Sequence, residues 1–135
     1  MANALFIETK QALLAGGANV DVQSGMAAAL IDHADDTPNP GAGGDDFWDD
    51  ILAAAVVAEV ALTGETLTDN VFDADDAVFA SVIGDPAESY LVWKDTGTDA
   101  TSRLFAFFDT LTGLPVTPGG GNITVAHHAS GIFAL

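Results

Sequence analysis

Short runs of apolar residues separated by polar turns predict a chain built mainly from β-strands. The densest signal lies in residues 88–124, where two aromatic-rich runs, 88–95 and 102–110, flank the polar segment 96–101. Because side chains alternate along a strand, each strand has two faces. On the first strand we expect one face to carry Tyr90, Val92 and Lys94 and the other to carry Leu91 and Trp93. On the second strand we expect one face to carry Leu104, Ala106 and Phe108 and the other to carry Arg103, Phe105 and Phe107. Both faces of this hairpin carry apolar residues, which predicts a central position in the sheet rather than an edge.

The rest of the chain indicates further short strands, which we expect over 18–32, 65–72 (interrupted at Asp69-Asn70), 76–83, 122–127 and 131–135. The run 51–62 is ambiguous, because its alanines favour a helix and its valines favour a strand. We expect a short helix near 46–52 and then a strand to about Thr63. Seven or eight short strands at this spacing predict a mainly β fold, a compact antiparallel β-sandwich or barrel-like domain.

Residues 3–15 have helical character. Asn3 can cap the helix and Gly16-Gly17 can end it. One face is shared by Leu5, Phe6, Thr9 and Leu13, which makes the helix amphipathic. Because about three turns of helix are marginal alone, we expect it to dock either on its own domain or on a neighbouring subunit.

The whole chain is expected to form one domain (1–135), with an N-terminal helix or arm at 1–17 and a β-rich body at 18–135. Within the body, residues 32–50 carry seven acidic residues together with prolines and glycines, which predicts a long solvated loop. Phe47 and Trp48 interrupt this polar stretch. We expect this aromatic pair either to anchor a short helical turn or to form an exposed plug for a partner.

Charge narrows the possible partners. The chain has 20 acidic and three basic side chains, a net charge of −17. We expect no direct binding to nucleic acid, because phosphate contacts need clustered cations. Binding to an anionic membrane surface is disfavoured for the same reason. The longest mostly apolar run, 51–62, contains Glu59 and is too short to span a bilayer. The acidity suits solubility or a partner with a basic surface, and the two explanations are compatible.

No residue pattern predicts catalysis, so we expect no catalytic, cofactor or metal site and no enzyme activity. The chain has no cysteine, which removes disulfides, thiolate metal sites and Cys nucleophiles. Asp73, Asp75 and Asp76 lack the glycine and closing glutamate of a calcium loop. His127 and His128 are adjacent on a predicted strand, so they point to opposite faces and cannot chelate one ion together.

Lys94 and Arg103 lie at the ends of the two hairpin strands. We expect them to pair with nearby acids and fix the turn, or to reach an acidic patch on a neighbouring copy. The acids concerned are Asp95, Asp99 and Asp109.

Several segments together resemble a family of small virion proteins of tailed bacteriophages, encoded among head-assembly genes. The segments are LTG at 62–64, DNVFDADD at 69–76, KDTG at 94–97, TSRL at 101–104, GLPVTP at 113–118, NITV at 122–125 and the terminal IFAL. The beginning ALFIETKQALLAGG and the stretch LIDHADDTPN are similar as well. The chain departs from the family where Ala126 to Gly131 replace a Trp-Asp-Asn-Gly-like turn, and it is more acidic and alanine-rich over 40–60.

The resemblance implies a head decoration, or cement, protein. Such a protein is made in the host cytoplasm, sits on the outer capsid surface of the virion and clamps subunits of the major capsid protein. It is often a homo-oligomer, with a trimer favoured. The partner contacts we expect are Phe6, Leu13, Phe47 and Trp48, because aromatic residues dominate interface energetics. Two alternatives remain, a head–tail connector or tail-tube component and an acidic binding module for a basic partner, including a DNA mimic.

Overall fold

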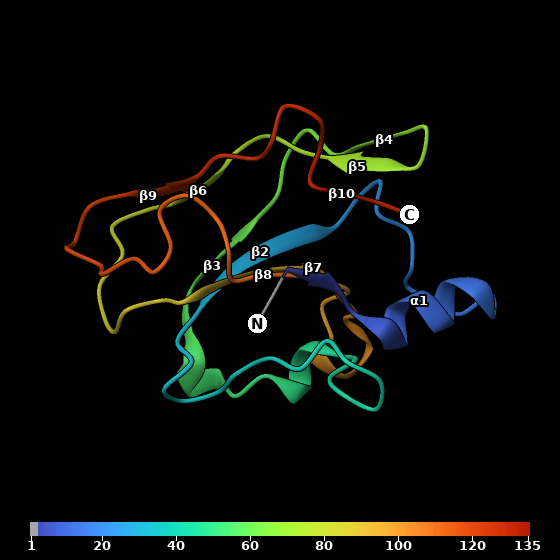
Figure 1. Cartoon of the computed structure of the whole chain (residues 1–135), viewed down its shortest axis with the longest axis horizontal. Helices are drawn as coiled ribbons and strands as arrows, with labels where there is room; N and C mark the ends of the chain where they lie inside the picture. Colours follow the sequence, from blue (N-terminus) through green and yellow to red (C-terminus); the bar gives the residue numbers. More distant parts are fainter. Residues whose placement is uncertain (1–2) are drawn as a thin grey trace.

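A central antiparallel sheet of five strands organises the molecule, which the computed structural model describes over residues 3–135 (Figure 1). Its strand order is β1 (Ala4–Leu5), β8 (Leu104–Phe108), β7 (Ser89–Lys94), β2 (Met26–Ile31) and β3 (Val56–Ala61). Two smaller antiparallel sheets lie over one face of it, above the central sheet in Figure 1. They are β10 (Phe133–Ala134), β5 (Val71–Asp73) and β4 (Thr66–Thr68), and β6 (Ala77–Phe79) with β9 (Ile123–Val125). The predicted mainly β, sandwich-like antiparallel fold is confirmed.

The described residues form ten strands rather than the seven or eight expected, for two reasons. The short β1 pairs with β8 at the N-terminus, and the predicted strand 65–72 divides into β4 and β5. Asp69 and Asn70 both have positive φ, 52° and 67°, as a two-residue type I′ turn requires. The interruption expected at this pair is therefore the turn of a hairpin in which Thr68 pairs with Val71.

The central position of the β7–β8 hairpin is confirmed, but a bulge changes the faces of β8. Val92 pairs with Ala106, whereas Trp93 pairs with Leu104, so Phe105 is an extra residue. An inserted residue reverses the alternation beyond it. As a result Leu104 packs on the Trp93 face with Phe107, and Phe105 packs on the Val92 face with Ala106. The predicted grouping of Leu104 with Ala106, and of Phe105 with Phe107, is therefore wrong.

The second face of the central sheet is covered by the N-terminal segment and by residues 32–55, which lie below the sheet in Figure 1. This cover includes two 3₁₀ turns, η1 (Trp48–Asp50) and η2 (Ala53–Ala55), so the short helix expected near 46–52 is present as η1. The buried residues of this layer are Phe6, Ala27, Ala29, Ile31, Trp48, Ile51, Ala55, Leu91, Trp93, Leu104 and Phe107. We call this set the lower core.

The prediction that 32–50 is a solvated loop is therefore wrong for part of its length. Asp32, Pro38, Pro40 and Trp48 are buried within it. The physical reason is that β2 and β7 are apolar on both faces, and a sheet of this kind must be covered on both sides. Apart from the buried Asp32, the acids of 32–50 are exposed or half-buried, whereas Trp48 packs in the lower core.

The N-terminal helix α1 (Ile7–Leu14) begins four residues later than predicted. Asn3 does not cap it, because its side-chain oxygen accepts hydrogen bonds from the backbone N–H groups of Asp109 and Thr110, both at 3.0 Å. The helix ends as expected at the glycine pair, where Gly17 N–H donates to Ala12 O at 2.7 Å. No helix in residues 3–135 is long and apolar enough to cross a membrane.

The helix docks on its own chain mainly through its first turn. Phe6, just before it, is completely buried, and Thr9 is the buried residue of the helix itself. The Thr9 hydroxyl donates a hydrogen bond to the carbonyl oxygen of Leu104. The far end projects from the body (Figure 1), where Leu14 is 91% exposed.

Candidate functional site

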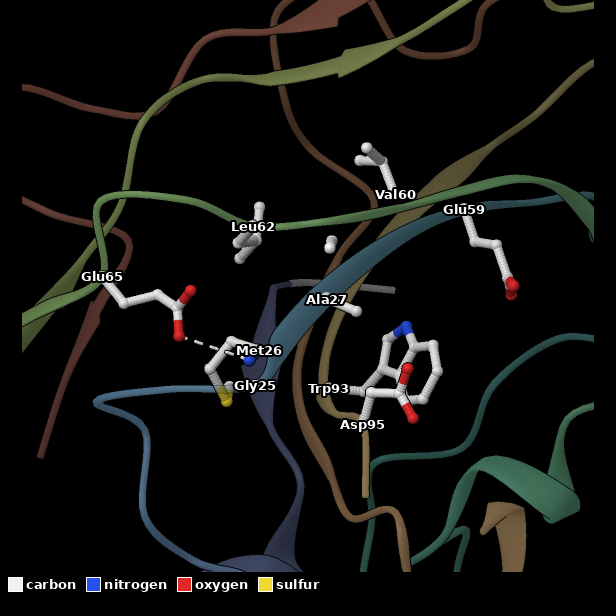
Figure 2. A pocket seen from close by; sticks show the side chains of 10 residues that line it. Gly25, Met26, Ala27, Glu59, Val60, Leu62, Glu65, Trp93 and Asp95 are labelled. Carbon is white, nitrogen blue, oxygen red and sulfur yellow. Dashed lines mark hydrogen bonds between the residues drawn. The ribbon is translucent and has the colours of Figure 1, made fainter. Parts of the chain in front are cut away.

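A groove of about 410 Å³ opens where β2 begins, along β3 and beside the end of β7 (Figure 2). Its shape follows from the cross-strand row in which Ala27 of β2 lies between Ala61 of β3 and Trp93 of β7. Two methyl side chains beside an indole ring leave the sheet hollow at this point. We call this hollow the Trp93 groove.

Three carboxylates surround the Trp93 groove. Glu59 projects from β3 on the same face as Ala61 because the two are separated by one residue, and its side chain is exposed. Asp95 follows β7, where its carboxylate accepts a hydrogen bond from Gly97 N–H at 2.8 Å. Glu65 accepts a longer one from Met26 N–H at 3.4 Å. The edge of the groove therefore carries negative charge, and the Lys94 side chain lies beside Gly25 in its lining.

The indole of Trp93 forms the wall of the groove. Its ring stacks on Trp48, with centroids 4.1 Å apart and planes 3° from parallel, and only 4% of the residue is exposed. Its Nε1 is the one buried side-chain nitrogen or oxygen without a hydrogen-bond partner among residues 3–135. In Figure 2 this nitrogen lies on the ring edge turned towards β2 and β3. Such an unpaired donor costs about 1–3 kcal/mol.

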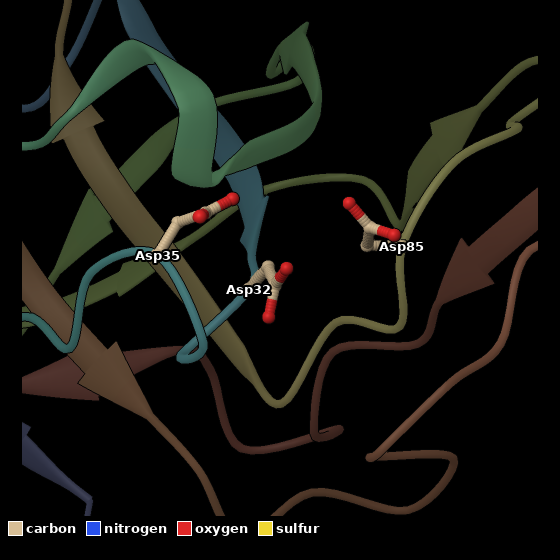
Figure 3. A group of neighbouring side chains, drawn as sticks. All are labelled: Asp32, Asp35 and Asp85. Carbon is tan, nitrogen blue, oxygen red and sulfur yellow. The ribbon is translucent and has the colours of Figure 1, made fainter.

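A second group of acids lies at the other end of β2 (Figure 3). The carboxylates of Asp32, Asp35 and Asp85 come within 4.8 Å of one another. Asp32 is buried, and its carboxylate accepts a hydrogen bond from Ala34 N–H at 2.8 Å. With one oxygen from each residue the group supplies three ligands, against the six to eight oxygens that calcium takes. No pattern in the sequence predicts this cluster, because Asp85 is distant from the other two residues in the chain.

A third acidic group is the pair Asp46 and Asp50, which closes the turn η1. The Asp50 carboxylate accepts hydrogen bonds from the backbone N–H groups of Asp46 and Phe47, at 2.9 and 3.1 Å. Burial opposes ionisation of Asp50, but these donors outweigh it and lower its pKa. Burial, and then the neighbouring Asp50, raise the pKa of Asp46 to about 6. Below about pH 6 Asp46 therefore holds a proton, and the Asp50 carboxylate stabilises the turn through its two backbone hydrogen bonds.

The structure contradicts a partner-contact role for two of the four predicted anchors in the folded chain. Phe6 is completely buried and Trp48 is only 8% exposed, because both pack in the lower core. Leu13 and Phe47 are half-buried, and a partner contact for them stays a prediction. The Arg103 guanidinium lies 4.8 Å from the centre of the Phe47 ring. Large exposed apolar side chains near these positions are Leu14 and Leu52.

The basic residues of the hairpin bind a different segment from the one predicted. Lys94 Nζ donates to the carbonyl oxygen of Ser24 and lies 3.9 Å from the Asp21 carboxylate. Arg103 Nε donates to the carbonyl oxygen of Ala18 at 2.9 Å. Both side chains thus fasten the segment before β2 to the hairpin, because that segment runs alongside the strand ends.

Hydroxyl groups hold the hairpin turn that Lys94 and Arg103 were expected to fix. Ser102 Oγ accepts from Thr96 N–H at 3.0 Å and donates to the carbonyl oxygen of Thr98 at 2.9 Å. The predicted charge pairing with Asp95 and Asp99 is replaced by these neutral bonds.

The Trp93 groove was missed from sequence for a simple reason. Its acids come from β3, from the turn after it and from the end of β7, so only the strand order brings them together. No protein-family model matches the chain, and a search of curated proteins finds no significant similarity. The resemblance to phage virion proteins therefore stays a prediction.

Proposed function

We propose that this protein decorates the icosahedral capsid of a tailed phage, on its outer surface, by bridging subunits of the major capsid protein. The observation that carries the proposal is the resemblance over residues 62–125. Its segments coincide with turns and strands of the fold, such as the Asp69-Asn70 turn and β9. Sequence likeness at such positions supports a shared scaffold, and the proposed role follows from that of the family.

The surface supports a binding role rather than a chemical one. A net charge of −17 and a groove edged by three carboxylates suit a partner that presents basic side chains. The projecting end of α1 offers the exposed Leu14 as an apolar contact. Each copy need bind only weakly, because a trimer engages several sites of a repeating shell and gains by avidity.

Deletion of the gene from the phage, followed by heating and osmotic shock of purified particles, tests the proposal. We expect particles that assemble but lose their DNA more readily, and rescue when purified protein is added back and co-sediments with the capsids. Particles of unchanged composition and robustness would contradict the proposal.

Quantitative mass spectrometry of wild-type virions separates the alternatives. Decoration predicts copies in proportion to the major capsid protein over the whole shell. A single ring of copies would instead indicate a head–tail connector, a stack of rings a tail tube, and a tight complex with a basic host protein outside the particle an acidic binding module.

A further inference from the structure

We infer that the free edge of β3 adds an extended segment of a partner protein to the central sheet as a further strand, with a lysine or arginine of that segment opposite Glu59. The inference deepens the proposed function, and rests on it only for the identity of the protein that supplies the segment. The free edge itself follows from the strand pairing.

β3 is an end strand of the central sheet and pairs only with β2. It has six residues, whereas the end strands β1, β4, β6, β9 and β10 have two or three each. Among residues 3–135, no backbone hydrogen bond joins the other side of β3 to another segment. A long end strand of this kind presents unpaired backbone groups to which an extended chain can bind.

The pairing with β2 decides which backbone groups of β3 face outwards. Leu62 N–H donates a hydrogen bond to Met26 O at 2.9 Å. Along an antiparallel strand, residues whose backbone groups point to the neighbour alternate with residues whose groups point away. The N–H and C=O groups of Ala61 and Glu59 therefore point away from β2, and both residues are exposed. Two donors and two acceptors thus lie in one row.

Two hollows on the same face of β3 offer room for the side chains of an added strand. The Trp93 groove is lined by Glu59 and Ala61, and a second hollow of about 550 Å³ is lined by Leu52, Val56 and Glu59. Side chains on one face of a strand are about 7 Å apart, so neighbouring ones can enter the two hollows. Leu52 is 58% exposed, and the second hollow therefore suits an apolar side chain.

Glu59 determines which residue of the added strand lies opposite it. Its side chain is exposed and makes no hydrogen bond or ion pair within residues 3–135. Opposite charges at facing positions of two strands stabilise the pair, and like charges destabilise it. The partner segment therefore carries a lysine or arginine opposite Glu59 and an apolar residue two positions along on the same face.

A second copy of this chain is a poor source of the added strand. Pairing two β3 strands would bring Glu59 close to its own copy and would join two chains of charge −17. The basic residues of the chain lie elsewhere, since Lys10 is on α1 and both Lys94 and Arg103 bind carbonyl oxygens of residues 18–24. The charge balance therefore favours a different protein with a basic segment.

Solution NMR of the isotope-labelled full chain tests the inference. The probe is the peptide acetyl-Thr-Val-Thr-Arg-Thr-Val-Thr-amide, whose side-chain pattern is the same in both chain directions. We expect saturable shifts of the amide signals of Glu59 and Ala61, and slower hydrogen exchange at these two amides when the peptide is bound. The amides of Ala58 and Val60 point to β2, so they should exchange slowly without peptide as well.

Two control peptides separate backbone pairing from charge. Proline in place of the four residues around the arginine keeps the charge but removes the N–H groups that a strand needs, and we expect no saturable binding. Citrulline in place of the arginine keeps nearly the same shape without the charge, and we expect at least threefold weaker binding. Equal binding of the proline peptide would overturn strand pairing, and equal affinity of the citrulline peptide would overturn the basic residue.

Variants locate the edge. Ala61→Pro removes an N–H that points away from β2, so the pairing with β2 remains, and we expect peptide binding at least about fivefold weaker. Circular dichroism checks that this variant is folded. Glu59→Lys should weaken binding of the arginine peptide at least threefold and favour a peptide with glutamate in its place. Asp35→Lys makes the same charge change at the other end of β2 and should leave binding unchanged. Unchanged affinity in Glu59→Lys, or in folded Ala61→Pro, would overturn the inference.

Analytical ultracentrifugation and capsid binding complete the test. A dimer of the free chain that Ala61→Pro dissociates would assign the edge to a second copy and overturn the inference. Peptide binding without capsid binding would contradict decoration and leave the edge assignment intact. Capsid binding that neither Ala61→Pro nor Glu59→Lys weakens would contradict the edge assignment and leave decoration intact.

Discussion

Replacing Trp48 with alanine tests whether the 32–50 segment is part of the core or a plug for a partner. The Trp48 side chain is 92% buried against Trp93, and a tryptophan buries roughly 200 Å². At about 25 cal/mol per Å² the loss is about 5 kcal/mol, and partial collapse of the loop onto the sheet brings this to about 3–5 kcal/mol. That is a large share of the roughly 5–15 kcal/mol available to a domain.

Urea denaturation followed by far-ultraviolet circular dichroism measures this loss. We expect the transition midpoint of Trp48→Ala to fall sharply. Phe47→Ala is the matched control, since the neighbouring ring is half-buried and stacks on Arg103, and its loss should be about 1–2 kcal/mol. A loss below about 1 kcal/mol for Trp48→Ala would refute the reasoning, since it would mean that the loop does not cover the sheet in solution.

Three further outcomes follow from single contacts. Thr9→Val keeps the shape but removes the hydroxyl that donates to Leu104 O; we expect a loss of about 1–2 kcal/mol by chemical denaturation, and Thr9→Ser should retain most of the stability. Asn70 has a φ of 67°, so Asn70→Ala should cost about 1 kcal/mol while Asn70→Gly should be neutral, and the opposite order would contradict the turn assignment. The pKa of Asp46 is raised from 3.8 to about 6. Between these two pH values the folded state holds a proton that the unfolded chain releases. The free energy of unfolding should therefore fall as pH rises from about 4 to 6. Asp46→Asn should remove that fall, and carboxyl-carbon NMR of Asp46 should show its midpoint near pH 6, whereas a midpoint near 4 would exclude the raised pKa.

The parts of the fold that depend only on residues close together in the chain could be predicted from the sequence. The hairpin β7–β8, the Asp69-Asn70 turn and the glycine end of α1 each carry a local signature, in apolar runs or in residues that tolerate positive φ. The bulge at Phe105 carries none, because the run 104–108 is apolar throughout and an extra residue leaves no mark in its pattern.

The candidate site was not predictable in the same way. The composition of 32–50 indicates solvent, yet its few apolar residues decide its position, because they cover the second face of the sheet. The Trp93 groove depends on strand order and on small residues facing a large one. A single sequence contains those residues but does not say which strands are neighbours.

The pairing of β1 with β8 has a consequence for how the chain is made. Ala4 pairs with Phe107, and Met26 of β2 pairs with Lys94 of β7. On the ribosome β2 can pair with β3 early, but β1 must wait for β8 and the other edge of β2 must wait for β7. Long-range pairing of this kind slows folding, and until β7 emerges one edge of the apolar β2 stays unpaired. The high acidic charge of the nascent chain then keeps neighbouring copies apart during that interval.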